Sequence, residues 1–123
     1  MAAILIVEDD KLLGRVLRDL LSDAGYKAFW ADSIDSAKIT LDAKEIHMVY
    51  LDLNLNNENG MHLLHYIKET EKLKSIMVII ISNEGQIEKL DTARELGAED
   101  FMVKAAIDYE NFVNFTKSKL PVY

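Results

Sequence analysis

Three carboxylates, Glu8, Asp9 and Asp10, follow an apolar run over residues 3–7 without a break. Like charges this close repel one another, and removing them from water is costly. Either all three point into solvent or a positive group compensates them. Asp10 also stands where the N-cap of a following helix would be, so the three acids need not share one role.

Three further polar residues end apolar runs elsewhere in the chain: Asp52, Ser82 and Lys104. If the runs are parallel strands, all these groups gather at one edge of the sheet. Carboxylates that face only one ammonium and one hydroxyl need a cation, and oxygen ligands without His or Cys suit Mg²⁺. The pattern therefore predicts a Mg²⁺ site to which the acidic run 8–10 and Asp52 both contribute. Each residue alone has a plainer explanation, because strand ends are commonly polar and a lone lysine usually forms a surface ion pair.

The elements that would position these residues follow from the hydrophobic pattern. Short apolar runs, which predict strands, alternate with longer stretches whose apolar residues have helical spacing. The expected strands cover residues 3–7, 26–31, 48–51, 76–81 and 101–104. The expected helices cover residues 11–24, 33–43, 61–73, 86–96 and 109–120. The Asn-rich segment 52–60 is expected to be a loop. Strict alternation of buried strands and helices predicts an α/β fold, a doubly wound sheet of five parallel strands with five helices.

The composition narrows the class of protein. With 123 residues, of which 50% are hydrophobic, the chain is expected to form one domain over residues 1–123. Its net charge of -7 argues against unaided binding to nucleic acids or anionic membranes. It has no cysteine, which excludes disulfides and thiolate metal sites and fits a reducing cytoplasm. We find no membrane-spanning segment or signal peptide, so we expect a soluble cytoplasmic protein.

Four motifs, ILIVEDD, VYLDLNLNNENG, VIIIS and GAEDFMVK, resemble the receiver domain of two-component response regulators. The resemblance covers the chain from residue 3 to about residue 120. It implies a flavodoxin-like sheet with strand order 2-1-3-4-5. By position it makes Asp52 the phosphoryl acceptor, Lys104 and Ser82 the residues that contact the phosphoryl group, and Gly60 the glycine that ends the loop after Asp52.

The same resemblance implies a metal site and a conformational switch. The Mg²⁺ ligands would be Glu8, Asp9, Asp52 and Asn54, the last through its backbone carbonyl. The switch residues would be Ser82 and Phe101. Three positions depart from the family pattern, which usually has proline at Asn56, a small residue at Asn83 and proline at Ala105. Because a non-proline cis bond costs about 2.5–4 kcal/mol, we predict a trans bond between Lys104 and Ala105.

The implied function is a signalling switch and not an enzyme. The phosphoryl donor would be a sensor histidine kinase or a histidine phosphotransfer protein. A downstream partner protein would bind the face formed by the fourth helix, the fifth strand and the fifth helix. The chain would have no output domain of its own and no direct contact with nucleic acid or membrane, and a homodimer is compatible with the resemblance.

Two other functions are weighed against this one. In a Mg²⁺-dependent phosphatase or phosphotransferase of the haloacid-dehalogenase type, YLDLN would be the nucleophile motif, but the acid expected two residues after Asp52 is Asn54. A flavodoxin-like nucleotide binder needs a phosphate cradle after the first strand. The segment EDDKLLG offers carboxylates at that place, and these would repel a phosphate.

Overall fold

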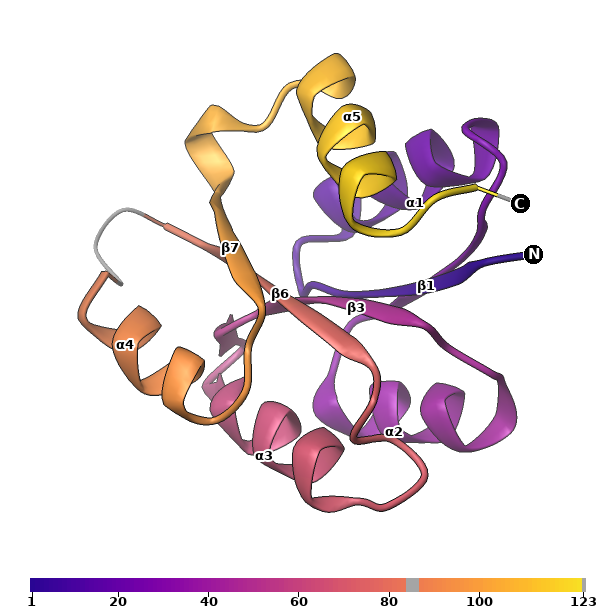
Figure 1. The fold of residues 1–123 in the computed structure, drawn as a ribbon. Coiled ribbons are helices and arrows are strands. Elements are labelled where there is room, and N and C mark those ends of the chain that lie inside the picture. The colour runs from indigo at the N-terminus through magenta and orange to yellow at the C-terminus, as the bar shows by residue number, and fades with distance from the viewer. Residues whose placement is uncertain (84–86, 123) are drawn as a thin grey trace.

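A five-stranded parallel sheet runs through the centre of the molecule (Figure 1). The computed structural model describes residues 1–83 and 87–122. The strands, in their order across the sheet, are β2 (Lys27–Ala31), β1 (Ala3–Val7), β3 (Met48–Asp52), β6 (Met77–Ser82) and β7 (Asp100–Val103). Every neighbouring pair is parallel. Counted along the chain these five strands have the order 2-1-3-4-5, which confirms the expected topology.

Helices cover both faces of this sheet. One face carries α1 (Lys11–Asp23) and α5 (Tyr109–Lys119). The other carries α2 (Ile34–Ala43), α3 (Met61–Glu69) and α4 (Ile87–Glu95) (Figure 1). Strand β1 is buried throughout because its side chains alternate between two cores: Ile4 and Ile6 belong to the core that includes residues of α1 and α5, Leu5 and Val7 to the other. This double burial explains why the strand has no polar alternation.

Side-chain caps fix where the first two helices begin. Asp10 Oδ1 accepts hydrogen bonds from the backbone N–H groups of Leu12 at 3.0 Å and Leu13 at 3.2 Å. This confirms Asp10 as the N-cap of α1. Ser33 caps α2 in a capping box with Ser36, whose backbone N–H donates to Ser33 Oγ at 3.1 Å.

The third helix is shorter than the expected span 61–73, because α3 ends at Glu69. The chain turns at Thr70, whose hydroxyl donates to the Tyr66 carbonyl at 2.6 Å and whose own carbonyl accepts from the Leu73 N–H at 2.9 Å. Leu73 is still buried, but the turn, and not a continuation of the helix, places its side chain in the core. The apolar spacing therefore predicted the burial correctly and the helix end wrongly. The expected helix start at Gln86 lies outside the described residues.

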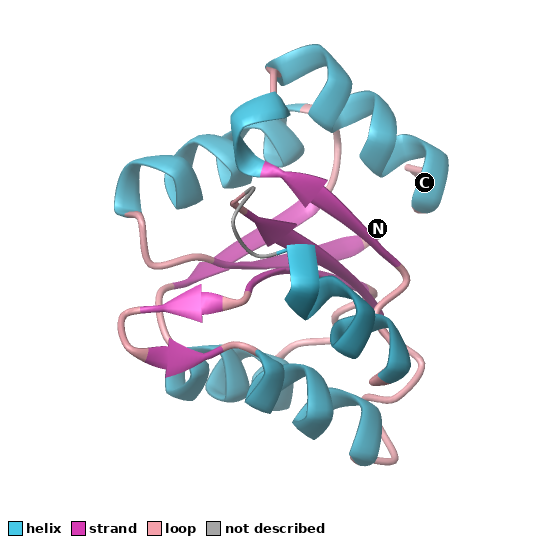
Figure 2. Cartoon of the chain, turned by 90° about the vertical axis from the view of Figure 1, so that its left-hand side faces the viewer, coloured by secondary structure: helices cyan, strands magenta, loops and turns pink. Residues whose placement is uncertain are grey.

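The segment expected to be a loop contains a small antiparallel hairpin, visible beside the main sheet in Figure 2. Its strands are β4 (Asn54–Leu55) and β5 (Glu58–Asn59). The two turn residues have positive φ angles, 41° for Asn56 and 69° for Asn57. Asparagine enters this left-handed region more readily than most residues, so the Asn-Asn pair permits a two-residue turn.

Strand β7 ends one residue before the expected boundary. Lys104 is not its last residue but the first of a short 3₁₀ helix, η2 (Lys104–Ala106). The described chain has no cis peptide bond, so the bond between Lys104 and Ala105 is trans, as predicted.

Both ends of the described chain lie at the edge of the sheet opposite the strand ends that carry the carboxylates (Figure 1). Met1, Ala2, His47 and Leu120 line one shallow hollow there. Tyr26 directly precedes β2, and its hydroxyl donates to the Leu120 carbonyl. This hydrogen bond fixes the end of α5 to this edge of the sheet. Among the described helices, none is both long and apolar enough to cross a membrane.

Candidate functional site

The polar residues expected at one edge of the sheet do gather there; Figure 2 faces this edge. Glu8 and Asp9 follow β1, Asp52 is the last residue of β3, and Ser82 is the last residue of β6. These three strands are neighbours, and Lys104 follows the next strand, β7. The parallel topology therefore accounts for the cluster directly.

Lys104 lies between two of the carboxylates. Its Nζ donates to Glu8 Oε1 and to Asp52 Oδ2, both at 2.7 Å. These are short, charge-assisted hydrogen bonds. Burial alone would lower the pKa of the Lys104 ammonium, but the hydrogen bonds to Asp52 and Glu8 outweigh it and raise this pKa above its ordinary value. The site thus holds a firmly protonated cation that bridges two acids.

Glu8 is the most deeply buried of the acids, with 0% of its surface exposed. Only one of its carboxylate oxygens is paired, because Oε2 has no hydrogen-bond partner among the described residues. Loss of hydration, followed by the contact with Asp52, raises the pKa of Glu8 from 4.5 to about 8, although Lys104 acts in the opposite direction. A second cation near Oε2 would favour the ionised form.

Three carboxylates are close enough to share such a cation. Glu8, Asp9 and Asp52 each offer one oxygen, and these oxygens all lie within 4.8 Å of one another. The donor set is purely oxygen, which suits Mg²⁺, and the unpartnered Glu8 Oε2 would gain a partner from it. The three residues therefore fit a divalent cation, and their role as Mg²⁺ ligands stays a prediction.

Two backbone contacts shape the surroundings of Asp52. The Asn54 N–H donates to Asp52 Oδ1 at 3.0 Å, which leaves this carboxylate paired on both oxygens. A Cβ atom on Gly60 would lie 2.3 Å from the Asp52 carbonyl oxygen and 2.8 Å from Leu53 Cα. Only glycine allows so close an approach of the hairpin to β3. The expected role of the Asn54 carbonyl as a metal ligand stays a prediction.

Ser82 and Phe101, the expected switch residues, occupy different surroundings. Ser82 is buried, and its Oγ has no hydrogen-bond partner among the described residues. Phe101 is half-buried against the core on the side of α4, with the Arg94 guanidinium 5.3 Å from its ring centroid. Ser82 therefore places a buried hydroxyl at the site that none of the described residues pairs, while the switching role of both residues stays a prediction.

Two contacts at the site carry no sequence motif and were missed. The indole Nε1–H of Trp30 donates to the Glu8 carbonyl at 2.8 Å. The ring lies on Gly14 of α1, where an added Cβ would come within 2.2 Å of Nε1. The signal in the sequence was Gly14 itself, because glycine in a helix interior is unfavourable and calls for a packing reason. The second missed contact joins Asn56 to Asp9, with the Asn56 N–H 2.9 Å from Asp9 Oδ2.

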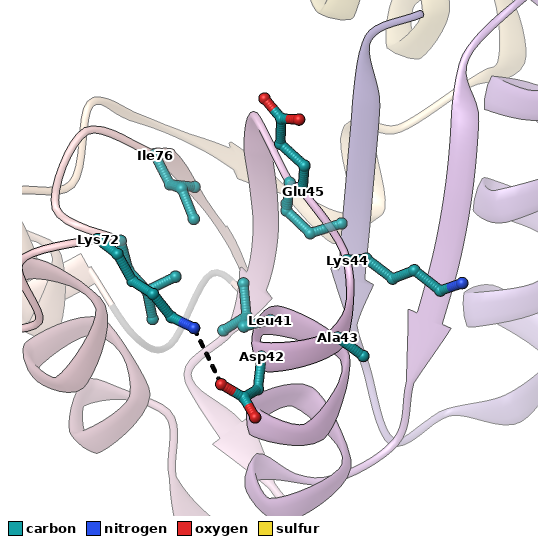
Figure 3. A pocket seen from close by; sticks show the side chains of 9 residues that line it. Leu41, Asp42, Ala43, Lys44, Glu45, Lys72 and Ile76 are labelled. Atoms are coloured by element: carbon teal, nitrogen blue, oxygen red, sulfur yellow. Dashed lines mark hydrogen bonds and ion pairs between the residues drawn. The ribbon is translucent and has the colours of Figure 1, made fainter.

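The structure also has a hollow of about 320 Å³ away from the acidic cluster (Figure 3). It lies between the end of α2 and the loop that leads into β6, and the ion pair between Lys72 and Asp42, 2.9 Å long, crosses it. It therefore lies toward the opposite edge of the sheet and contributes nothing to the carboxylate site.

Known proteins share both the sequence pattern and the fold. Residues 4–114 match the family model described as "Response regulator receiver domain". The two-component response regulator ORR3 of Oryza sativa subsp. indica is 32% identical over 101 residues, covering 78% of this chain and 75% of that protein. The transcriptional regulatory protein BasR of Escherichia coli (strain K12) is 34% identical over 104 residues, covering 82% of this chain and 45% of BasR. The crystal structure of the receiver domain of NtrX from Brucella abortus superposes with a TM-score of 0.86 at 28% identity, covering 98% of this chain and 99% of that one.

Proposed function

The chain belongs to the response regulator receiver domain family of two-component systems, and from this premise we propose that Asp52 accepts a phosphoryl group in a Mg²⁺-dependent transfer. The observation that carries the proposal is the position of Lys104. Its Nζ lies 2.7 Å from Asp52 Oδ2 and 2.7 Å from Glu8 Oε1. Phosphoryl transfer depends mostly on positioning and on charge stabilisation, and a fixed ammonium beside the acceptor supplies both.

The chemistry proposed for the site uses its own residues in distinct roles. A carboxylate is a nucleophile that can take up a phosphoryl group as an acyl phosphate. An oxygen of Asp52 would form a bond to phosphorus while the bond from phosphorus to the donor breaks. Mg²⁺, held by Glu8, Asp9 and Asp52, would supply positive charge to the phosphoryl oxygens. Lys104 would pair with one of these oxygens, and the buried hydroxyl of Ser82 would donate to another.

Signal transmission is proposed to run through Ser82 and Phe101. An added phosphoryl group brings about -1.5 to -2 charge units, by analogy with other phosphoresidues. Movement of Ser82 toward this charge would open space beneath Phe101, which is only half-buried. The surface affected is formed by α4, β7 and α5, and this is where we expect a downstream partner protein to bind.

The proposed phosphoryl donor is a sensor histidine kinase or a histidine phosphotransfer protein in the cytoplasm. Receiver domains are in general signal transducers. The family match gives no support to the alternative of a haloacid-dehalogenase-type phosphatase. The backbone carbonyl of Asn54 is proposed as an additional Mg²⁺ ligand, and a homodimer would be compatible with the proposed function.

The proposal is tested by incubation with acetyl phosphate and Mg²⁺, followed by intact mass measurement. We expect the wild-type chain to gain one phosphoryl group, and to gain none when Mg²⁺ is removed by EDTA. Asp52→Asn should gain none under any condition. Asp10→Asn is the matched control, because Asp10 caps α1 and lies outside the acidic cluster found among the described residues, and it should gain one group as the wild type does. A full mass gain in Asp52→Asn would refute the assignment.

A further inference from the structure

The turn of the β4–β5 hairpin has a backbone geometry that few residue types permit. Asn54 pairs with Asn59 and Leu55 pairs with Glu58, so only Asn56 and Asn57 form the turn. Their φ angles are 41° and 69°. Two consecutive residues with positive φ define the turn type that matches the twist of a hairpin. Proline, which has φ near about -65°, cannot occupy either position in this geometry.

This hairpin is fixed to two other loops at the carboxyl edge of the sheet. The Asn56 N–H donates to Asp9 Oδ2 at 2.9 Å. On the other side, Glu58 Oε1 accepts from the Ile34 N–H at the start of α2, at 3.3 Å. Leu55 anchors the hairpin from below, because it is buried in the core. The position of the Asn56 N–H is therefore fixed by the buried Leu55 before it and the Glu58–Ile34 hydrogen bond after it, and not by the Asn56 side chain.

Asp9 is otherwise the least restrained acid of the proposed metal site. Glu8 is enclosed by the core and paired with Lys104, and Asp52 accepts from both Lys104 and the Asn54 N–H. Asp9 is half-exposed, and the hydrogen bond from Asn56 holds one of its oxygens. The other oxygen remains able to bind a cation. Ligating carboxylates are commonly oriented by such hydrogen bonds from outside the ligand set.

We propose that the backbone N–H of Asn56 is a positioning group that orients Asp9 as a Mg²⁺ ligand, and that the Asn56–Asn57 turn exists in this chain to deliver it. The inference rests on the proposed function, because it requires that Mg²⁺ binds to Glu8, Asp9 and Asp52. It adds a group from outside the acidic cluster, at a position where the resemblance to receiver domains would place a proline. Proline has no N–H and could not make this contact.

The test compares the Mg²⁺ affinity of four chains. Each chain is titrated with Mg²⁺, and binding is monitored through the NMR resonance of the Trp30 indole N–H. Trp30 is the only tryptophan, so its indole N–H gives a single, easily assigned signal. This N–H donates to the Glu8 backbone carbonyl at 2.8 Å, which places the reporting group beside the proposed metal ligands. Asn56→Pro removes the N–H and the positive φ together. A backbone ester at residue 56, made with the α-hydroxy analogue of asparagine, replaces the N–H by an oxygen and keeps the asparagine side chain. Asn56→Gly keeps both and is the matched control.

We expect the ester chain and Asn56→Pro to bind Mg²⁺ about tenfold more weakly than the wild type, the lower end of what an orienting contact contributes. Asn56→Gly should stay within about twofold of the wild type, since it retains the orienting N–H. An ester chain that binds Mg²⁺ as tightly as the wild type, or more tightly, would overturn the inference and leave the proposed function intact. A wild-type chain that does not bind Mg²⁺ would overturn both. The comparison does not depend on phosphorylation, so a general loss of activity cannot imitate the expected result.

Discussion

Replacing Glu8 by Gln should remove a pH dependence that the buried acid imposes on stability. Glu8 is fully buried, and desolvation is the main reason that its pKa rises from 4.5 to about 8. In the unfolded chain this carboxyl ionises at its ordinary pKa. Between these two values the folded protein therefore holds one proton more than the unfolded protein, and the free energy of unfolding must fall as pH rises.

The size of the effect follows from the same two values. Each pH unit between 4.5 and 8 lowers the free energy of unfolding by at most about 1.4 kcal/mol, so the whole interval sets an upper bound of roughly 5 kcal/mol. This stability is fully present below pH 4.5 and lost once pH exceeds about 8. Domains of this size have about 5–15 kcal/mol in total, so a loss of even half the bound would be measurable.

The assay is urea unfolding from pH 5 to pH 9 in EDTA, for the wild type and Glu8→Gln. The glutamine amide resembles the protonated acid in shape and in its ability to donate to Asp52, so the variant should lack the descending limb. Contributions to the pH dependence that are common to both chains cancel in the difference between them. Saturating Mg²⁺ should flatten the wild-type profile as well, because the cation takes the place of the proton.

Asp10→Asn provides the matched control for this experiment, because it removes an exposed carboxylate two residues away. It should keep the wild-type slope between pH 5 and pH 8. The reasoning would be refuted if the profiles of Glu8→Gln and the wild type ran parallel in EDTA. That result would mean that Glu8 ionises in the folded protein as readily as in water.

Three further changes have expected outcomes. Lys104→Met leaves two buried carboxylates without their shared cation and should cost about 3–5 kcal/mol in EDTA, partly restored by Mg²⁺, as measured by urea unfolding; an unchanged midpoint would contradict the buried ion pair. Gly60→Ala forces a methyl group against the Asp52 carbonyl and should cost about 1–3 kcal/mol or more in the same assay. Asp10→Ala removes the cap of α1 and should cost about 1 kcal/mol while Mg²⁺ affinity stays at the wild-type value, and a large loss of affinity would show that Asp10 belongs to the metal site.

The sequence was sufficient to predict the sheet and the acidic cluster because both follow from one simple pattern. Apolar runs predicted the ends of the five strands of the parallel sheet to within one residue, and parallel strands bring their carboxyl ends together by geometry. The position of Asp52 at this edge followed from the sequence alone, since Asp52 directly follows the run 48–51. The position of Lys104 was likewise predicted, although it begins the 3₁₀ helix η2 instead of ending a strand.

The missed features depend on backbone atoms, which leave little trace in side-chain patterns. The Trp30 indole donates to the backbone carbonyl of Glu8. Because every residue has a backbone carbonyl, the type of the partner residue gives no indication of this contact. The hairpin is built on two-residue strands, too short to show alternation. The Asn56–Asn57 pair permits the turn, but many loops contain asparagine. Only the folded chain shows that the N–H of Asn56 meets the carboxylate of Asp9.

The two ends of the described chain lie close together, and this has a practical consequence for the study of the protein. Met1 and Leu120 line the same hollow, at the edge of the sheet away from Glu8, Asp9 and Asp52. A fluorescent protein or a surface tether attached at either end would therefore leave the acidic edge open to a macromolecular donor. A short linker between the ends would also allow circular permutation, with new ends placed in an exposed surface turn. Such permutants would test whether the arrangement of the carboxylates depends on the order in which the strands are connected along the chain.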